Sequence, residues 1–65
     1  MLKFTGHVRE QMIERGISVN EVDEAIRMGV KILQENGKIL AAHKYYKVAY
    51  KKEGEDYIII TVMLR

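Results

Sequence analysis

The chain has 65 residues and a mass of 7.6 kDa, which is enough for one small domain and too little for two. Its composition, 48% hydrophobic and 31% charged, is typical of a folded domain and not of a disordered segment. The absence of cysteine excludes disulfides, thiolate zinc sites and cysteine nucleophiles, and a net charge of +2 permits nucleic-acid binding without requiring it.

The first predicted element is a helix over residues 6–15. Thr5 precedes it with a hydroxyl that can cap free amide groups. Gly16 follows it, at a position where helices end in the left-handed conformation. Val8 and Met12 give this helix an apolar stripe.

A second helix is predicted over residues 19–28, ending near Gly29. The segment Ser18–Glu21 has the pattern of a capping box, the strongest local signal in the sequence. Asp23 and Arg27 are four positions apart, so we expect them to pair on the solvent side of this helix.

After Gly29 the period of the apolar residues changes from 3.6 towards 2, which indicates strands. Three strands are predicted, at Val30–Glu35, Ile39–Lys52 and Glu55–Leu64. The turns between them are predicted at Asn36-Gly37 and Glu53-Gly54. The second strand is long enough to be bent or bulged. The sequence therefore predicts an α+β fold (ααβββ), a single domain spanning residues 1–65 with two N-terminal helices packed on a three-stranded antiparallel β-meander.

A two-residue turn at Glu53-Gly54 also predicts a register for the last two strands. The opposed pairs would be Tyr50 with Tyr57, Val48 with Ile59 and Tyr46 with Thr61. One face of the sheet would then carry Leu33, Leu40, Tyr46, Val48, Tyr50, Tyr57, Ile59, Thr61 and Met63. The other face would carry Ile39, Tyr45, Lys47, Ala49, Ile58, Ile60, Val62 and Leu64. We expect the helices to cover the first face, because Lys47 interrupts the second.

This arrangement predicts both a core and an exposed ladder. The predicted core residues are Val8, Met12, Val22, Ile26, Val48, Ile59 and Ile60. The last strand would leave an apolar ladder on the uncovered face, made of Ile58, Ile60, Val62 and Leu64. Such a ladder is unusual on a stable monomer, so we expect a homodimer or another partner to cover it.

Four short segments are similar to those of one small protein family. They are Phe4-Thr5-Gly6-His7, Arg15–Ser18, Val48–Tyr50 and Ile60–Val62. Together they resemble DUF 4258, a domain of unknown function. The resemblance implies, by fold analogy, a domain near the RelE and barnase-like ribonucleases of bacterial toxins, with RNA as substrate and an antitoxin protein as partner. The family often has an arginine one turn after the histidine, where this chain has Gln11.

Cleavage of RNA without a metal needs a base for the 2′-hydroxyl, an acid for the leaving oxygen and a cation for the phosphorane. His7 can be the base or the acid, and Arg15, on the same ridge of the first helix, can be the phosphate clamp. Tyr50 and Thr61 are the candidate orienting donors, and His7 can meet Thr61 only if the helices cover the sheet face that carries Tyr46 and Thr61. The alternative is structural: the arginine stem covers the edge of the core, and the histidine bonds to backbone near the helix start.

A second candidate site lies on the middle strand, where cations alternate with aromatic residues. Such a strand can follow phosphates and stack bases. The candidate nucleic-acid-binding residues are His43, Lys44, Tyr46 and Lys47. The alternative is a solvated edge strand protected by its lysines.

Other classes of site have weak support. His7 and Glu10 have the spacing of two helical metal ligands, but no third ligand follows at motif spacing, so we expect no metal or other cofactor. The longest apolar runs are far shorter than the ~20 residues of a membrane span, and no signal peptide is recognisable, so we expect a cytoplasmic protein. The sequence favours a toxin-like endoribonuclease that acts without a metal. The alternative is a non-catalytic module that binds RNA or protein and self-associates through its last strand.

Overall fold

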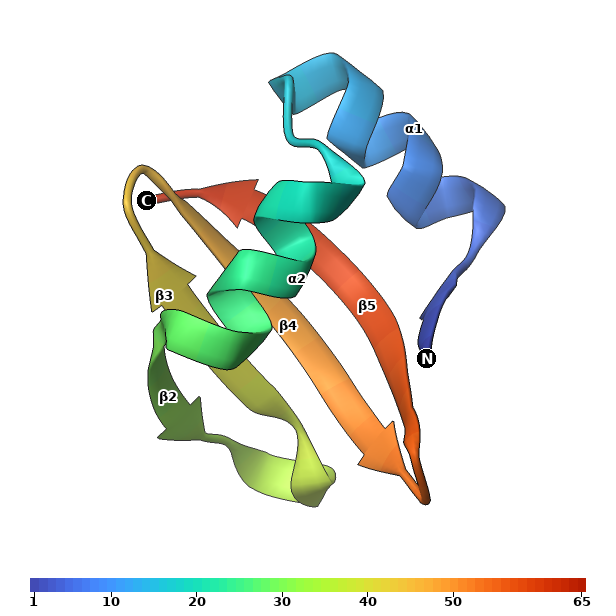
Figure 1. The fold of residues 1–65 in the computed structure, drawn as a ribbon, viewed down its shortest axis with the longest axis vertical. Coiled ribbons are helices and arrows are strands. Elements are labelled where there is room, and N and C mark those ends of the chain that lie inside the picture. The colour runs from blue at the N-terminus through green and yellow to red at the C-terminus, as the bar shows by residue number, and fades with distance from the viewer.

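The computed structural model describes residues 1–65, which form two helices, a five-stranded mixed sheet and one short 3-10 turn (Figure 1). The helices are α1 (Gly6–Arg15) and α2 (Val19–Met28), and the 3-10 turn is η1 (Glu35–Gly37). The strands are β1 (Leu2–Phe4), β2 (Val30–Leu33), β3 (Ile39–His43), β4 (Tyr46–Glu53) and β5 (Asp56–Leu64). The sheet order is β1-β5-β4-β3-β2, with β1 parallel to β5 and all other pairs antiparallel.

The α+β class and both helices are confirmed, and local hydrogen bonds explain why. Thr5 Oγ1 accepts from the Val8 amide at 3.2 Å, and Gly16 ends α1 in the left-handed conformation. The capping box of Ser18 and Glu21 is formed in both directions. Each helix is therefore fixed at its ends by residues within four positions of the cap.

The prediction of a three-stranded antiparallel meander is wrong, because it misses two strands and a parallel pair. β1 has three residues, too few to show a periodicity, and it is held by contacts distant in sequence. The Tyr57 amide donates to the Met1 carbonyl at 2.8 Å, and the N-terminal amine donates to the Glu55 carbonyl at 2.9 Å. Lys3 Nζ lies 3.2 Å from a carboxylate oxygen of Asp56.

The predicted long strand over Ile39–Lys52 is two strands, β3 and β4. The chain reverses at Lys44 and Tyr45, where Lys44 has φ 53°. No glycine, proline or asparagine marks this turn, so the sequence carries no turn signal there. The other predicted turn lies where expected, with positive φ at Asn36 and Gly37, but it is not a two-residue hairpin turn, because β2 ends at Leu33 and η1 lies between β2 and β3.

The predicted register of the last hairpin is also wrong. The turn residues are Gly54 and Glu55, so Tyr50 pairs with Ile59 rather than with Tyr57. A β-bulge then leaves Ile60 without a partner, because Ala49 pairs with Thr61. Beyond the bulge Val48 pairs with Val62 and Tyr46 with Leu64.

The bulge breaks the predicted ladder on the last strand. Val62 is turned into the core and is fully buried, whereas Ile58 and Ile60 stay half-buried on the opposite face. Leu64 lies at the exposed end of β5. These four residues therefore do not form one uncovered stripe.

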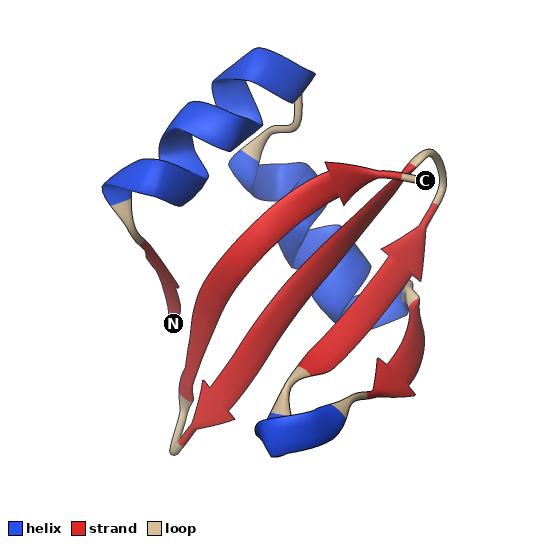
Figure 2. Ribbon diagram, turned by 180° about the vertical axis from the view of Figure 1, so that it is seen from behind, coloured by secondary structure: helices blue, strands red, loops and turns tan.

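The core lies between the helices and one face of the sheet. The helices cover the face of Tyr46, Val48 and Ile59, as the position of Lys47 predicted. Of the seven predicted core residues, Ile60 alone is outside the core. The cluster of buried residues is Val8, Met12, Ile17, Val22, Ala25, Ile26, Ala41, Tyr46, Val48, Tyr50, Ile59 and Val62. Seen from behind, α2 lies on the far side of the sheet and neither α1 nor α2 covers the near face (Figure 2). Neither of the ten-residue helices could span a membrane.

Replacing Ile59 with alanine should lower the free energy of unfolding by about 2–5 kcal/mol, because it opens a cavity in the centre of the core. Chemical denaturation measures this change. Ile58→Ala is the matched control, since its side chain lies on the uncovered face and is already half-exposed. Equal losses in the two variants would contradict the assignment of the faces.

Candidate functional site

A chain of three polar side chains joins α1 to the edge of β5. Gln11 Oε1 accepts from the Thr61 hydroxyl at 2.9 Å and from the Val62 amide at 3.2 Å. The amide nitrogen of Gln11 lies 3.3 Å from Nε2 of His7. β1 pairs only with Tyr57–Ile59 of β5, so no strand reaches the Val62 amide on that edge. Gln11 supplies the hydrogen-bond acceptor that this amide would otherwise lack. His7 and Thr61 are therefore linked through Gln11 at the edge of β5, and not on the face that carries Tyr46, where they were expected to meet.

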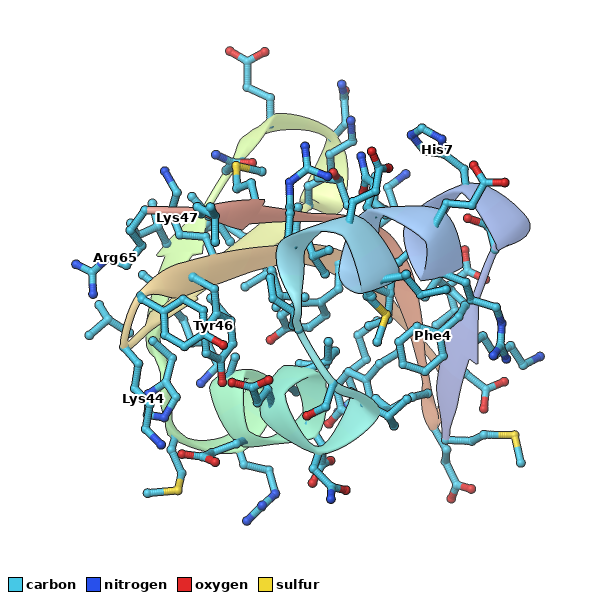
Figure 3. All side chains as sticks on the ribbon, turned by 90° about the horizontal axis from the view of Figure 1, so that it is seen from above. Phe4, His7, Lys44, Tyr46, Lys47 and Arg65 are labelled. Atoms are coloured by element: carbon cyan, nitrogen blue, oxygen red, sulfur yellow. The ribbon has the colours of Figure 1, made fainter.

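The contact with Gln11 sets the tautomer of His7. Because the oxygen of Gln11 already accepts two hydrogen bonds, its NH₂ group is the donor to His7 Nε2. The neutral ring then carries its proton on Nδ1. The His7 side chain is exposed and projects on the side of the sheet opposite α2 (Figure 3). It is thus an accessible acid–base group at the edge of the uncovered face.

The structure does not bring the other two catalytic candidates to His7. Arg15 is exposed at the C-terminal end of α1, eight positions and about 12 Å of helix axis away. Tyr50 is buried on the helix-covered face, with its ring 5.7 Å from that of Tyr57 in an edge-to-face arrangement. Burial raises the pKa of the Tyr50 phenol.

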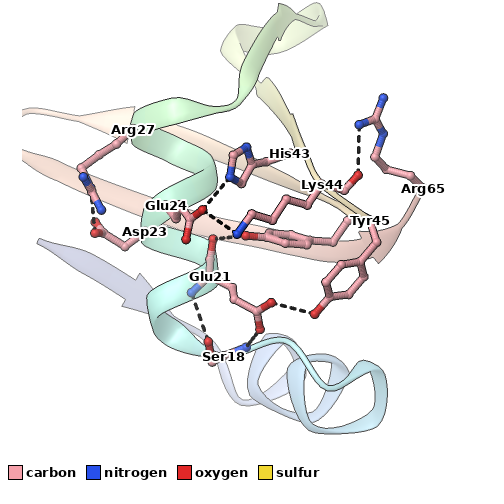
Figure 4. A network of polar contacts seen from close by, with 10 residues as sticks. Ser18, Glu21, Asp23, Glu24, Arg27, His43, Lys44, Tyr45 and Arg65 are labelled. Carbon is pink, nitrogen blue, oxygen red and sulfur yellow. Dashed lines mark hydrogen bonds and ion pairs between the residues drawn. The ribbon is translucent and has the colours of Figure 1, made fainter.

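The turn between β3 and β4 is fastened to α2 (Figure 4). His43 Nε2 and Lys44 Nζ lie 2.8 Å and 3.0 Å from the same carboxylate oxygen of Glu24. The Tyr45 hydroxyl donates to the carboxylate of Glu21 at 2.7 Å. Two of the predicted RNA-binding residues, His43 and Lys44, thus face α2 and are engaged by an acid.

Tyr46 is the fully buried end of this attachment. Its hydroxyl donates to the backbone carbonyl of Glu21 at 2.8 Å, and burial raises its pKa to about 12. Its ring lies between the sheet and α2 and offers no surface for base stacking (Figure 3). Tyr46 therefore joins the turn between β3 and β4 to α2.

Hydrogen bonds also lower the pKa of both acids at this turn. The bond from His43, followed by that from Lys44, lowers the pKa of Glu24. The bond from Tyr45, followed by the Ser18 backbone bond, lowers the pKa of Glu21. Both carboxylates are held in the charged form that attaches the turn.

The sheet face away from the helices, here named the open face, carries Lys47 and Lys51 among apolar side chains, and at one end of it Lys3 is paired with Asp56. Lys47 and Lys51 lie on it because they alternate with the buried residues Val48 and Tyr50 of β4. The remaining residues on this face include Lys3, Leu40, Ala42, Ala49, Ile58, Ile60 and Met63. Lys51 is not among the binding residues predicted from the sequence, although its spacing of four from Lys47 in a strand places both on one face.

The hollows of the surface lie elsewhere. A shallow groove of about 410 Å³ runs between α1 and the start of α2, lined by Arg9, Met12, Ile13, Gly16, Ile17, Ser18 and Val19. It lies beside neither His7 nor the open face. No three His, Asp or Glu side chains gather as they would to hold a metal ion.

Comparison with known proteins finds a matching family and a solved structure of similar fold. A family model described as "Domain of unknown function (DUF4258)" matches residues 4–64, which confirms the resemblance drawn from the sequence. A chain of the toxin-antitoxin complex RelBE2 from Mycobacterium tuberculosis superimposes with a TM-score of 0.70 and 20% identity, over 100% of this chain and 96% of that one. No curated protein matches the sequence.

The turn attachment should make stability depend on acid pH. A carboxyl with a lowered folded pKa stabilises the fold above its ordinary pKa of 4.5, and this contribution is lost as the pH falls through the folded value. Glu24→Gln should therefore flatten the loss of unfolding free energy below about pH 5. Denaturation across the pH range measures it, and Glu10→Gln, which alters an exposed acid without an ion pair, should leave the slope unchanged.

Proposed function

The chain belongs to the DUF4258 family, and from this and the geometry above we propose that it is a toxin-like domain that binds RNA on the open face and cleaves it with His7. The observation that carries the proposal is the position of His7. It projects beside the one sheet face that no helix covers, and that face carries Lys47 and Lys51 (Figure 3).

The lysines supply the affinity in this proposal. Ammonium groups on the open face neutralise phosphates and hold the strand without reading its sequence. On the neighbouring strand β5, the aliphatic side chains of Ile58 and Ile60 offer a half-buried surface for the bases. The helix-covered face offers neither charge nor access.

His7 supplies the chemistry. Nε2, once released from the Gln11 amide, takes the proton of a 2′-hydroxyl, and the 2′-oxygen attacks the adjacent phosphorus. The P–O bond to the 5′-oxygen then breaks, and that oxygen leaves with a proton from water. The products are a 2′,3′-cyclic phosphate and a 5′-hydroxyl. Thr61 holds Gln11 and thereby sets the resting position of the imidazole. Arg15 would bind a phosphate further along the strand.

A second candidate function is RNA binding without cleavage. It is favoured by the exposure of His7, since no cleft around it excludes water from the reacting phosphate. Either function can be paired with an inhibitory protein partner, as the name of the structurally similar toxin-antitoxin complex suggests.

His7→Ala should lower the rate of RNA cleavage in the presence of a metal chelator by a factor of about 10²–10⁴. The thermal midpoint should hardly change, because the side chain is exposed and makes one exposed contact. The other histidine is the control: His43→Ala should keep the cleavage rate but lower the midpoint, since it loses the bond to Glu24.

If the wild type binds RNA but does not cleave it, cleavage is excluded and RNA binding remains as the function. If His7→Ala unfolds the domain, the histidine is structural and the catalytic role is excluded.

Lys47→Ala should weaken RNA binding and reduce the slope of log affinity against log salt by about 0.7, the value for one phosphate contact on a single strand. Lys44→Ala is the matched control, because Lys44 lies on the α2 side and pairs with Glu24. Fluorescence anisotropy over a salt series measures both. A larger loss in Lys44→Ala would place the RNA on the turn between β3 and β4 instead.

A further inference from the structure

The free edge of the sheet at β2 is the most exposed apolar part of the chain. Nine large hydrophobic residues are exposed, and four of them lie between positions 28 and 33. These are Met28 at 65%, Val30 at 69%, Ile32 at 49% and Leu33 at 78% exposure. Edge strands of monomers are commonly guarded by charges, bulges or prolines, but β2 carries one charge, that of Lys31.

The backbone of this edge is also unpaired. β2 is the last strand in the sheet order, and its partner β3 lies on one side only. The Gln34 amide donates to the Lys38 carbonyl at 2.8 Å, so residue 34 directs its amide toward the β3 side. Because this direction alternates along a strand, Ile32 also faces β3, whereas Lys31 and Leu33 turn their N–H and C=O groups outward.

We propose that β2 pairs antiparallel with β2 of a second copy of this chain, about a two-fold axis perpendicular to the sheet and centred on Ile32. Ile32 then lies opposite Ile32 of the other copy. Lys31 lies opposite Leu33, and these two residues exchange the outward N–H···O=C bonds that the monomer leaves unmade. The interface is isologous, as a two-fold axis requires.

The other registers are disfavoured, and one centred on Val30 would need the Gly29 amide, which already donates to the Ala25 carbonyl. A perpendicular two-fold axis keeps each sheet face on its own side, so only registers centred on a residue match the faces. Centring on Lys31 would set two like charges directly opposite each other. Centring on Leu33 would need residues 34–36 to be extended, yet the chain turns at η1 with Asn36 at φ 62°.

The proposed pairing covers apolar side chains on both faces of the edge. Val30 and Ile32 share the open face, because they pair with Ala42 and Leu40 of β3. Leu33 lies on the face of the helices and would pack on the aliphatic stem of Lys31 from the other copy. The Lys31 ammonium already bends back to the Gly29 carbonyl at 2.9 Å, so its charge need not enter the interface.

The absence of cysteine makes the register directly testable. In a non-hydrogen-bonded antiparallel pair the Cα atoms are about 4.5 Å apart, within the range that a disulfide spans. Ile32→Cys should therefore form an intermolecular disulfide readily with oxidised glutathione. Val30→Cys, equally apolar and on the same face, would lie opposite Gln34 and should cross-link roughly tenfold more slowly. Equal rates would overturn the register.

Light scattering tests the association itself. The wild type should have the mass of two chains at high concentration, and Ile32→Lys the mass of one, with an unchanged circular dichroism spectrum. Ile13→Lys is the control, because Ile13 is 82% exposed on α1, away from β2. A wild-type mass of one chain at all concentrations would overturn the proposal, as would dissociation of Ile13→Lys but not of Ile32→Lys.

Discussion

Two short helices can cover only one face of this sheet, and the other surfaces of the molecule follow from that limit. Each helix has ten residues, about 15 Å of length, and both are used to enclose the core around Val48 and Ile59. The opposite face and the β2 edge stay uncovered, and they hold the lysines and the exposed aliphatic residues. Along the edge of β5 that β1 leaves unpaired, the side chain of Gln11 accepts a hydrogen bond from the Val62 amide. Gln11 also bonds to His7 and thereby positions it.

The parts of the fold that the sequence predicted are those set by local hydrogen bonds. Thr5, Gly16 and the Ser18–Glu21 box specify both helices within a turn of chain. The bulge at Ile60 has no such signal, because β5 is apolar on both faces and lacks the alternation that fixes a register. Because of this one extra residue, Thr61 and Val62 lie on the faces opposite to those predicted. β1 and the reversal at Lys44 likewise depend on contacts with residues far along the chain.

The structure changes where the predicted site residues lie relative to the sheet. His7 and Thr61 were expected to meet on the helix-covered face, with Thr61 opposite Tyr46. Instead each of them bonds to Gln11 of α1 at the edge of β5, because the bulge turns Thr61 away from the helix-covered face. The aromatic residue between lysines, Tyr46, suggested a stacking surface, but strand alternation buries it. The same alternation, applied to β4, would have identified Lys51 beside Lys47.

The proposed pairing at β2 and the proposed RNA surface are compatible because they use different groups. Pairing consumes outward backbone of Lys31 and Leu33, whereas RNA would contact side chains on the open face. A perpendicular two-fold axis keeps the open faces of both copies on one side, so their lysines would lie on the same side of the joined sheet, separated by the apolar residues of β2 and β3. His7 lies by β5, separated from β2 by β4 and β3, and stays accessible in the pair. A protein that adds a strand at β2 would therefore compete with the second copy, whereas a protein that blocks cleavage must cover the open face or the His7 edge.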